Sequence, residues 1–346
     1  MAVMSKKDRI DAAVRGEAVD RAPVSLWRHF YECEETAEGL AGAMLAWQAK
    51  YDWDWMKVNP RASYHVEGWG VKLRFSGQAL VKPVVLEVPV QAPADWGKIR
   101  PLPVDTPALD EQLEVMERLC EALGSKVYAL ETVFSPLSIA GDLVSEGGHL
   151  VEAMRRDPQA VHGALQAITE TFEAFVRRLL QAGADGIFFA TTEWASHDVL
   201  TDEQYAEFGR PYDLRVLAAA QENAGFNVLH VCRNNNMALA LADYPVHAIN
   251  WAVGSPGNPT LREVQAAAGK AVIGGFQNET LRDSDAAHIN AEARAADMQT
   301  GGRWWILGPA CSIAVDTPEA NVRAARDIAN ALGEGPAEGG GQVISG

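Results

Sequence analysis

The chain has 346 residues, of which 48% are hydrophobic and 22% charged, a composition that indicates a globular protein with a large core and excludes a mostly disordered one. Its formal net charge of −16 repels phosphate backbones, so we do not expect nucleic acid as a partner. No apolar run approaches the roughly 18–20 residues of a membrane helix, and the charged N-terminus lacks the apolar region of a signal peptide; we therefore expect a cytoplasmic protein with no membrane association.

Along the chain, one pattern recurs eight times: a short apolar run precedes a longer stretch with the features of a helix. Continuous apolar runs of this length are typical of strands in parallel sheets, which are covered on both faces. The eight predicted strands are 22–28, 53–60, 126–134, 183–193, 226–233, 246–254, 271–278 and 304–312.

Residues typical of helix ends occur at several places between these strands. Asp157, followed by Pro158, is expected to cap a helix that ends at Gly183. Thr201 and Gln204 have the spacing of a capping box, and Pro211 indicates a break soon afterwards. A last helix is expected within 316–332.

Eight strand–helix pairs predict a single (β/α)8 barrel of the TIM type over residues 1–332. An open dinucleotide-binding sheet is less favoured because no G-x-G-x-x-G motif follows the first strand. Segment 61–103 does not fit the repeat. Its apolar residues at alternate positions, such as Val71, Leu73 and Phe75, and its glycines predict a β-hairpin insertion after the second strand. The glycine-rich segment 333–346 is expected to be disordered.

Four cysteines are too few and too scattered for a disulfide framework, which favours a reducing compartment. Two of them, Cys232 and Cys311, fall at the C-terminal ends of the fifth and eighth predicted strands, and His230 lies two residues before Cys232. Active sites of such barrels form at this end of the strands, and one nitrogen with two sulfurs suits zinc. Spacing alone favours ordinary buried cysteines and a buried histidine, and with the placement at strand ends added this interpretation stays open beside zinc.

Several segments resemble the uroporphyrinogen decarboxylase superfamily over roughly residues 5–332. They are 19–24, 127–140, 229–232 and 307–322, which read VDRAPV, VYALETVFSPLSIA, LHVC and LGPACSIAVDTPEANV. The resemblance implies a distorted (β/α)8 barrel.

One branch of that superfamily consists of decarboxylases that act without a metal on a carboxylated tetrapyrrole. Arg28 matches the first of their two substrate-binding arginines, but Glu32 stands at the second, and the histidine expected after the eighth strand is absent. Asp54 lies near the family's aspartate in a loose alignment. A metal-independent decarboxylase is therefore the first alternative.

The other branch consists of zinc-dependent methyltransferases, whose H-x-C motif and distant cysteine match His230, Cys232 and Cys311. This resemblance implies Zn²⁺ and methyl transfer between a cobalamin, such as methylcobalamin, and a thiol or similar acceptor. No D-x-H-x-x-G motif of a corrinoid-binding domain is present, so the cobalamin would be free or held by a separate carrier protein. A homodimer is compatible with the family, and a non-catalytic zinc- or corrinoid-binding protein is the second alternative.

Further candidates are polar residues near the predicted strand ends. Glu131 and Glu193 are candidates for a fourth zinc ligand or a general base. The candidates for substrate binding are Arg28, His29, Asn59, Gln277 and Asn278.

Overall fold

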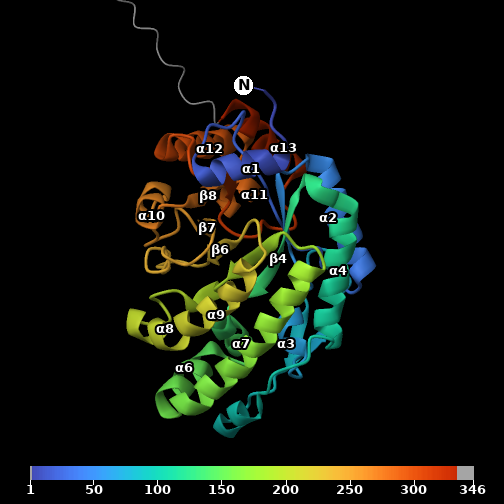
Figure 1. The fold of residues 1–346 in the computed structure, drawn as a ribbon, viewed down its shortest axis with the longest axis vertical. Helices are drawn as coiled ribbons and strands as arrows, with labels where there is room; N and C mark the ends of the chain where they lie inside the picture. The colour runs from blue at the N-terminus through green and yellow to red at the C-terminus, as the bar shows by residue number, and fades with distance from the viewer. Residues whose placement is uncertain (1, 333–346) are drawn as a thin grey trace, which may run out of the picture.

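A curled sheet of seven parallel strands forms the centre of the protein, with helices around its outside (Figure 1). The computed structural model describes residues 2–332; the predicted disorder of 333–346 lies outside them. The strands, in their spatial order, are β1 (Trp55–Val58), β4 (Tyr128–Phe134), β5 (Gly186–Ala190), β6 (Val228–Val231), β7 (Ala248–Trp251), β8 (Ala271–Phe276) and β9 (Trp305–Pro309).

The first predicted strand, 22–28, is not a strand of the sheet, which corrects the expected count of eight. Val24 forms only an isolated parallel bridge with Leu307 of β9, and its carbonyl accepts a hydrogen bond of 3.0 Å from the backbone N–H of Asp54. Pro23 has no N–H to donate, while the N–H of Ser25 bonds to the Leu307 carbonyl at 3.2 Å and its hydroxyl bonds to the Trp55 carbonyl at 2.7 Å. The segment still lies between β9 and β1, so the curled sheet is consistent with a TIM-like fold.

The helices begin and end close to their sequence signals. Asp157 caps α7 by accepting from the N–H of Ala160, and Thr201 and Gln204 form the predicted capping box. The helix expected within 316–332 begins at Glu319. The helices are α1 (Lys6–Arg15), α2 (Ala37–Tyr51), α3 (Tyr64–Glu67), α4 (Pro107–Leu123), α5 (Pro136–Asp142), α6 (Gly147–Arg156), α7 (Pro158–Gln181), α8 (Asp202–Phe208), α9 (Arg210–Gln221), α10 (Leu261–Ala268), α11 (Asn278–Asp283), α12 (Ala286–Thr300) and α13 (Glu319–Ile328).

Between β1 and α4 the chain forms a small antiparallel sheet of β2 (Lys72–Arg74) and β3 (Val84–Glu87). It lies within the segment for which a hairpin insertion is predicted. Neither strand joins the parallel sheet. Val84, Val85 and Leu86 are each about half exposed.

Alternation along the strands divides the core into two parts. One set of side chains fills the interior of the curled sheet, namely Trp55, Leu130, Phe188, Val228, Ile273 and Ile306. The residues between them pack outward against the helices. Helix α1 contributes Ile10 and Ala13 to the interior cluster. It therefore covers one end of the interior, and the C-terminal ends of the strands are left to form a site.

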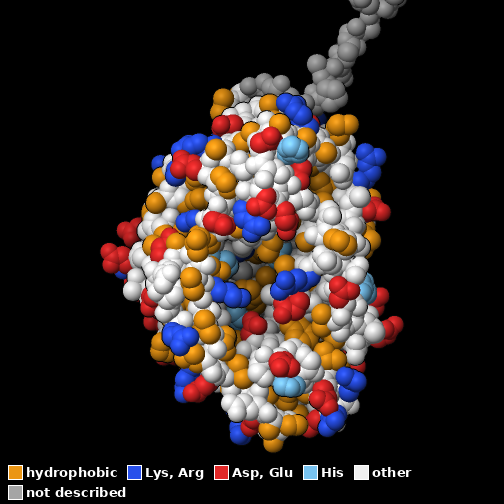
Figure 2. All heavy atoms as spheres, turned by 180° about the vertical axis from the view of Figure 1, so that it is seen from behind, with side chains coloured by type: hydrophobic (Ala, Val, Ile, Leu, Met, Phe, Trp, Pro, Cys, Tyr) orange, Lys and Arg blue, Asp and Glu red, His pale blue; other side chains and the backbone are white. Residues whose placement is uncertain are grey.

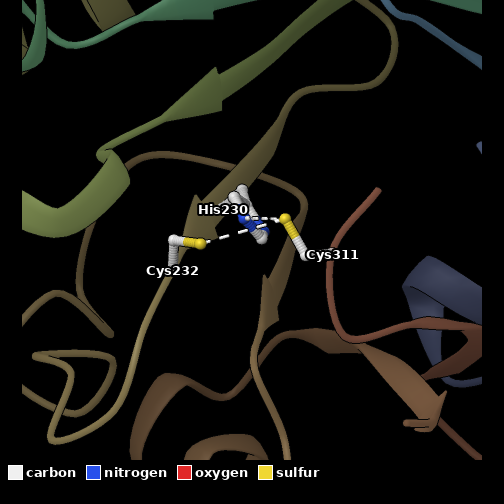
Figure 3. Close-up of side chains that lie close together, drawn as sticks. All are labelled: His230, Cys232 and Cys311. Atoms are coloured by element: carbon white, nitrogen blue, oxygen red, sulfur yellow. Dashed lines mark hydrogen bonds between the residues drawn. The ribbon is translucent and has the colours of Figure 1, made fainter. Parts of the chain in front are cut away.

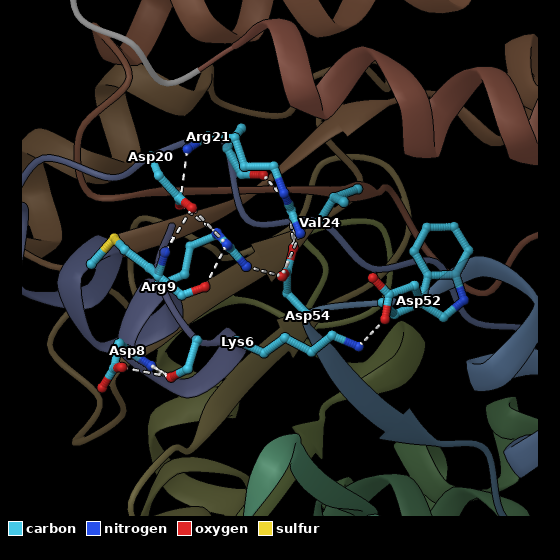
Figure 4. Close-up of polar contacts among 12 residues, drawn as sticks. Lys6, Asp8, Arg9, Asp20, Arg21, Val24, Asp52 and Asp54 are labelled. Carbon is cyan, nitrogen blue, oxygen red and sulfur yellow. Dashed lines mark hydrogen bonds and ion pairs between the residues drawn. The ribbon is translucent and has the colours of Figure 1, made fainter. Parts of the chain in front are cut away.

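A buried network of charges lies beside α1 (Figure 4). Asp54 is fully buried and accepts hydrogen bonds from Arg9 at 2.7 Å and from Arg21 at 2.7 and 2.8 Å, while Arg9 also pairs with Asp20. Asp54 therefore ties the N-terminal segments to the start of β1. This arrangement argues against a role for Asp54 as the substrate aspartate suggested by the loose alignment.

Within residues 2–332, none of the helices has both the length and the hydropathy needed to cross a membrane.

Candidate metal centre

Three potential metal ligands meet where β6 and β9 end. His230 lies within β6, Cys232 directly follows β6, and Cys311 follows β9 by two residues. Figure 3 shows their side chains pointing toward one another. The Sγ atoms of Cys232 and Cys311 are 3.8 Å apart, and Sγ of Cys311 is 3.6 Å from Nε2 of His230. All three donor atoms lie within 4.8 Å of one another.

These separations suit tetrahedral zinc. With Zn–S near 2.3 Å and Zn–N near 2.0–2.1 Å, tetrahedral angles place two sulfurs about 3.8 Å apart and a sulfur and a nitrogen about 3.6 Å apart. The measured distances for Cys311 match both values. Three protein ligands leave a fourth position for an exogenous group, as in catalytic zinc sites. The donor set therefore fits zinc in both chemistry and spacing.

Asn250 on β7 holds the imidazole of His230 in the orientation that a metal ligand requires. The amide nitrogen of Asn250 donates to the carbonyls of Ile273 and Pro309, at 3.0 Å each, so its oxygen is left to accept. That oxygen lies 2.6 Å from Nδ1 of His230. Nδ1 must then carry the proton, and Nε2 presents its lone pair toward the cysteines.

The two thiols have opposite electrostatic environments. The hydrogen bond from Cys232 and the positive charge of Lys57 lower the pKa of Cys311. The same hydrogen bond, together with burial, raises the pKa of Cys232. In the bare cluster, Cys311 is thus the thiol that ionises first. A thiolate is the form of cysteine that binds metals.

The donors line a cavity of about 200 Å³. The hollow near the centre of the face in Figure 2 has charged side chains around its rim. Aromatic and aliphatic groups form much of the wall, which also carries several polar and charged side chains. The lining residues are Trp27, His29, Lys57, Asn59, Pro60, Thr132, Phe134, Phe188, Ala190, Thr192, Glu193, His230, Cys232, Arg233, Cys311 and Ser312.

Two lining residues have strained backbones. Thr192 has a φ of 44° and Arg233 a φ of 68°, a region that L-residues rarely adopt and that is unusual for a β-branched side chain. Such strain costs on the order of 1–3 kcal/mol and clusters at functional sites. The rest of the fold holds both residues in place at the cavity.

Three of the predicted site residues outside the metal cluster line the cavity. Asn59 donates to the Ser312 hydroxyl at 3.1 Å, and His29 stacks on Tyr31. Burial, followed by the charge of Lys57, lowers the pKa of His29 to about 4, so its ring is neutral at pH 7. Glu193 lies at the rim, 4.0 Å from Arg233.

The structure places Glu131 away from the cavity. Thr132 is a lining residue, so its strand neighbour Glu131 points to the opposite face of β4. Glu131 is fully buried there, and burial raises its pKa well above the usual value. Glu131 is therefore neither among the residues that line the cavity nor among the three clustered donors.

The other three candidates surround the site without lining it. Arg28 turns away and donates to the carbonyl of Val315. Gln277 bonds to the carbonyl of Val253. The Asn278 side chain donates to the Ser312 carbonyl at 2.9 Å and accepts from the N–H of Cys311 at 3.3 Å. Asn278 therefore positions the segment that carries Cys311.

The sequence reasoning missed Lys57, which is only 6% exposed and lines the cavity from β1. Its Nζ lies 3.1 Å from Oδ1 of Asn59 and 4.9 Å from the centre of the Phe188 ring. Burial lowers its pKa to about 8. A lysine inside the otherwise apolar strand WMKV was the available signal, because lysine is rarely buried without a reason.

Fold and site together define an α/β protein of the TIM type with a His-Cys-Cys donor set at the ends of its strands. The sequence matches the uroporphyrinogen decarboxylase (URO-D) family over residues 5–332, so the chain belongs to that family.

Relatives within the family have different activities. The chain is 22% identical over 341 residues to the methylcobamide:CoM methyltransferase MtbA of Methanosarcina acetivorans, covering 93% of this chain and 97% of that protein. It is 30% identical over 228 residues to a uroporphyrinogen decarboxylase of Mycobacterium sp., covering 60% and 62%. A solved methyltransferase from Methanosarcina mazei shares its fold, with a TM-score of 0.74 and 23% identity over 94% of this chain and 98% of that one.

Proposed function

We propose that this protein is a zinc-dependent methyltransferase that moves a methyl group between a cobalamin and a thiol or similar acceptor. The observation that carries the proposal is the convergence of His230, Cys232 and Cys311 at separations that suit tetrahedral zinc. Similarity to a methylcobamide:CoM methyltransferase along nearly the whole chain supports the corrinoid link. The cobalamin would be free or held by a separate carrier protein.

Each group at the site has a role in this chemistry. Bound zinc would lower the pKa of a thiol at its open position, so that the thiol reacts as the thiolate nucleophile. Asn250 keeps Nε2 of His230 directed at the ion, and Asn278 holds the backbone at Cys311. The apolar wall limits the water around the reacting sulfur.

Glu193 is the carboxylate available to take up the thiol proton, since no other Asp or Glu in the described part of the chain lines the cavity. We expect Glu193→Gln to slow transfer while the zinc content stays the same. A variant with unchanged rates across pH would contradict this role.

The test combines metal analysis with anaerobic spectroscopy. We expect one zinc per chain, and conversion of methylcobalamin to the reduced cobalt species when a thiol is added. Cys232→Ala and Cys311→Ala should lose zinc and transfer together, whereas Cys120→Ala, on α4 and away from the cluster, should retain both. A protein that lacks stoichiometric zinc, or cysteine variants that stay fully active, would contradict the proposal. Cobalamin binding without methyl exchange would instead indicate a binding protein.

A further inference from the structure

The hairpin of β2 and β3 carries a contiguous group of exposed apolar side chains. Of the nine large hydrophobic side chains that are exposed in residues 2–332, five lie within seven positions of this hairpin, namely Leu80, Val81, Val84, Val85 and Leu86. Single apolar side chains on a surface are ordinary, whereas a contiguous group marks an interaction site. These five residues, which we call the hairpin patch, therefore call for a partner that covers them.

The hairpin holds its shape through its own hydrogen bonds. The Ser76 hydroxyl donates to the Val81 carbonyl at 2.9 Å and accepts from the N–H of Gln78 at 3.1 Å, and the N–H of Val81 donates to the Gln78 carbonyl at 3.1 Å. At the other end, Lys72 pairs with Glu87 at 2.6 Å. The hairpin patch is thus presented on a formed element.

The hairpin patch borders the mouth of the metal cavity. Arg61 directly follows a residue that lines the cavity, and its guanidinium lies 5.5 Å from the centre of the Phe75 ring at the end of β2. Near the tip of the hairpin, Lys82 is within electrostatic reach of His29, another lining residue: after burial and Lys57, the charge of Lys82 also lowers the pKa of His29. Both the base and the tip of the hairpin therefore lie beside the cavity.

The cobalamin of the proposed reaction is too large for that cavity. Its volume of about 200 Å³ is below the roughly 300–1,000 Å³ of pockets that enclose drug-sized ligands, and a cobalamin is larger than those. The corrin ring must therefore lie across the mouth, with its periphery over the neighbouring surface. That periphery carries methyl and neutral amide groups, and the tail that joins the ring to its nucleotide carries a phosphate.

We propose that the hairpin patch is a cobalamin-binding surface, in which Leu80 and Val81 contact the periphery of the corrin and Lys82 pairs with the phosphate of the nucleotide tail. This inference rests on the proposed function, because it takes cobalamin as the reactant. The charge of Lys82 is available for this role: Glu87 is the only acidic residue of segment 72–87 and is already paired with Lys72.

A second copy of the chain fits the hairpin patch less well. Each chain has a formal net charge of −16, so two copies repel each other. Pro83 directly precedes β3, and Pro89 follows it by two residues. Proline beside an exposed strand hinders the addition of a further strand, because it has no N–H to donate. These features favour a ligand that contacts side chains over one that extends the sheet.

The test compares two corrinoids that differ in the nucleotide tail, methylcobalamin and methylcobinamide. Equilibrium dialysis in the dark, with zinc-loaded protein and no thiol, gives their dissociation constants from the corrin absorbance. The double variant Leu80→Ser, Val81→Ser should bind both corrinoids about 10-fold more weakly, because apolar contact is lost. Lys82→Met should weaken methylcobalamin about 3- to 5-fold, the effect of an exposed ion pair, and leave methylcobinamide unchanged.

Matched controls lie away from the mouth. Met298→Ser removes an exposed apolar side chain from α12, and Lys126→Met removes an exposed charge just before β4. Both variants should bind the two corrinoids like the wild type. All of the changed side chains are at the surface, so the variants should fold, and their zinc content should equal that of the wild type.

The outcomes separate this inference from the proposed function. Unchanged binding in the double variant, or equal weakening of both corrinoids by Lys82→Met, would overturn the cobalamin-binding surface alone. A wild type that binds neither free corrinoid would also overturn it. A dimer in light scattering that the double variant dissociates would assign the hairpin patch to a second copy instead. Absence of both zinc and methyl transfer would overturn the proposed function, and this inference with it.

Discussion

Asn250 is a neutral residue that determines how His230 can act. Both hydrogens of its amide are held by backbone carbonyls of β8 and β9, and its oxygen therefore has to accept from Nδ1 of His230. The amide is fully buried, so water cannot take over this contact. The orientation of the candidate zinc ligand thus depends on three neighbouring strands.

We expect Asn250→Ala to weaken zinc binding by about 10- to 100-fold, the usual effect of losing a partner behind a metal-binding histidine. Competition with a chromophoric chelator measures this. Asn321→Ala is a matched control because the amide of Asn321 also donates to two backbone carbonyls, those of Leu281 and Ser284 at the C-terminal end of α11. Equal zinc affinity in the two variants would argue against a role for Asn250 at the metal.

At the residue scale, the sequence predicted those features of the site that depend on residues close together in the chain. His230 and Cys232 lie two apart on one strand and therefore point the same way. Glu131 shows the limit: its position near the end of a strand was predictable, but the face to which it points depends on the strand's parity and register. Lys57 was missed because its burial is a property of the assembled cavity.

At the scale of elements, the charge network of Figure 4 joins α1, the bridged segment at Val24 and the start of β1. Asp54 accepts from both Arg9 and Arg21, and from the N–H of Val24 at 2.8 Å. The segment lacks a proper ladder, so these bonds hold it between β9 and β1. Removing the carboxylate would leave two arginines without their shared partner.

We expect Asp54→Asn to lower the free energy of unfolding by about 3–5 kcal/mol, as when one member of a buried pair is lost. Denaturant titration measures this loss. Asp283→Asn, which breaks an exposed pair with Arg282, should leave the midpoint unchanged. Equal stability of the two variants would show that the network does not hold the segment.

Asp213 links α9 to two other segments through its Oδ2, which accepts from the hydroxyls of Tyr205 and Tyr244 at 2.7 and 2.8 Å. Burial raises its pKa to about 7, whereas the unfolded chain releases this proton near pH 3.9. Between about pH 4 and 7 the folded protein therefore binds more protons, so this group's contribution to stability is greatest at low pH and falls as pH rises.

We expect Asp213→Asn to flatten the pH dependence of the denaturation midpoint between about pH 4 and 7, because asparagine does not titrate there. The exposed variant Asp105→Asn should keep the wild-type slope. A slope that is unchanged in Asp213→Asn would mean that Asp213 is ionised in the folded protein at low pH.

Helices were more predictable than the first strand, and for a physical reason. The cap of α7 at Asp157 and the box at Thr201 depend on residues within one turn. The segment at 22–28 reads as an apolar strand, but it forms only one bridge, between Val24 and Leu307, and Pro23 has no N–H with which to extend the pairing. Strand pairing of this segment depends on its two neighbours in space, the start of β1 and β9. These lie about 30 and 280 residues away along the chain.

At the scale of the whole molecule, the recurrence of strand and helix predicted the α/β architecture. The position of the cluster depends on that architecture, because β6 and β9 are three strands apart in the sheet and only its curl brings their ends together. A flat sheet would separate Cys232 from Cys311. The metal centre is thus a property of the folded chain, and zinc should bind the folded state in strong preference to the unfolded one.

Zinc should therefore stabilise the whole molecule. A ligand at about 100 times its Kd adds about 2.7 kcal/mol, which for a chain of this size predicts a rise in Tm of about 4 °C over the metal-free protein. Calorimetry with and without a chelator measures this shift. Cys232→Ser and Cys311→Ser should lose it, whereas Cys33→Ser should keep it. An equal shift in all three variants would show that zinc binds elsewhere, because the stabilisation requires β6 and β9 to present their donors to one ion.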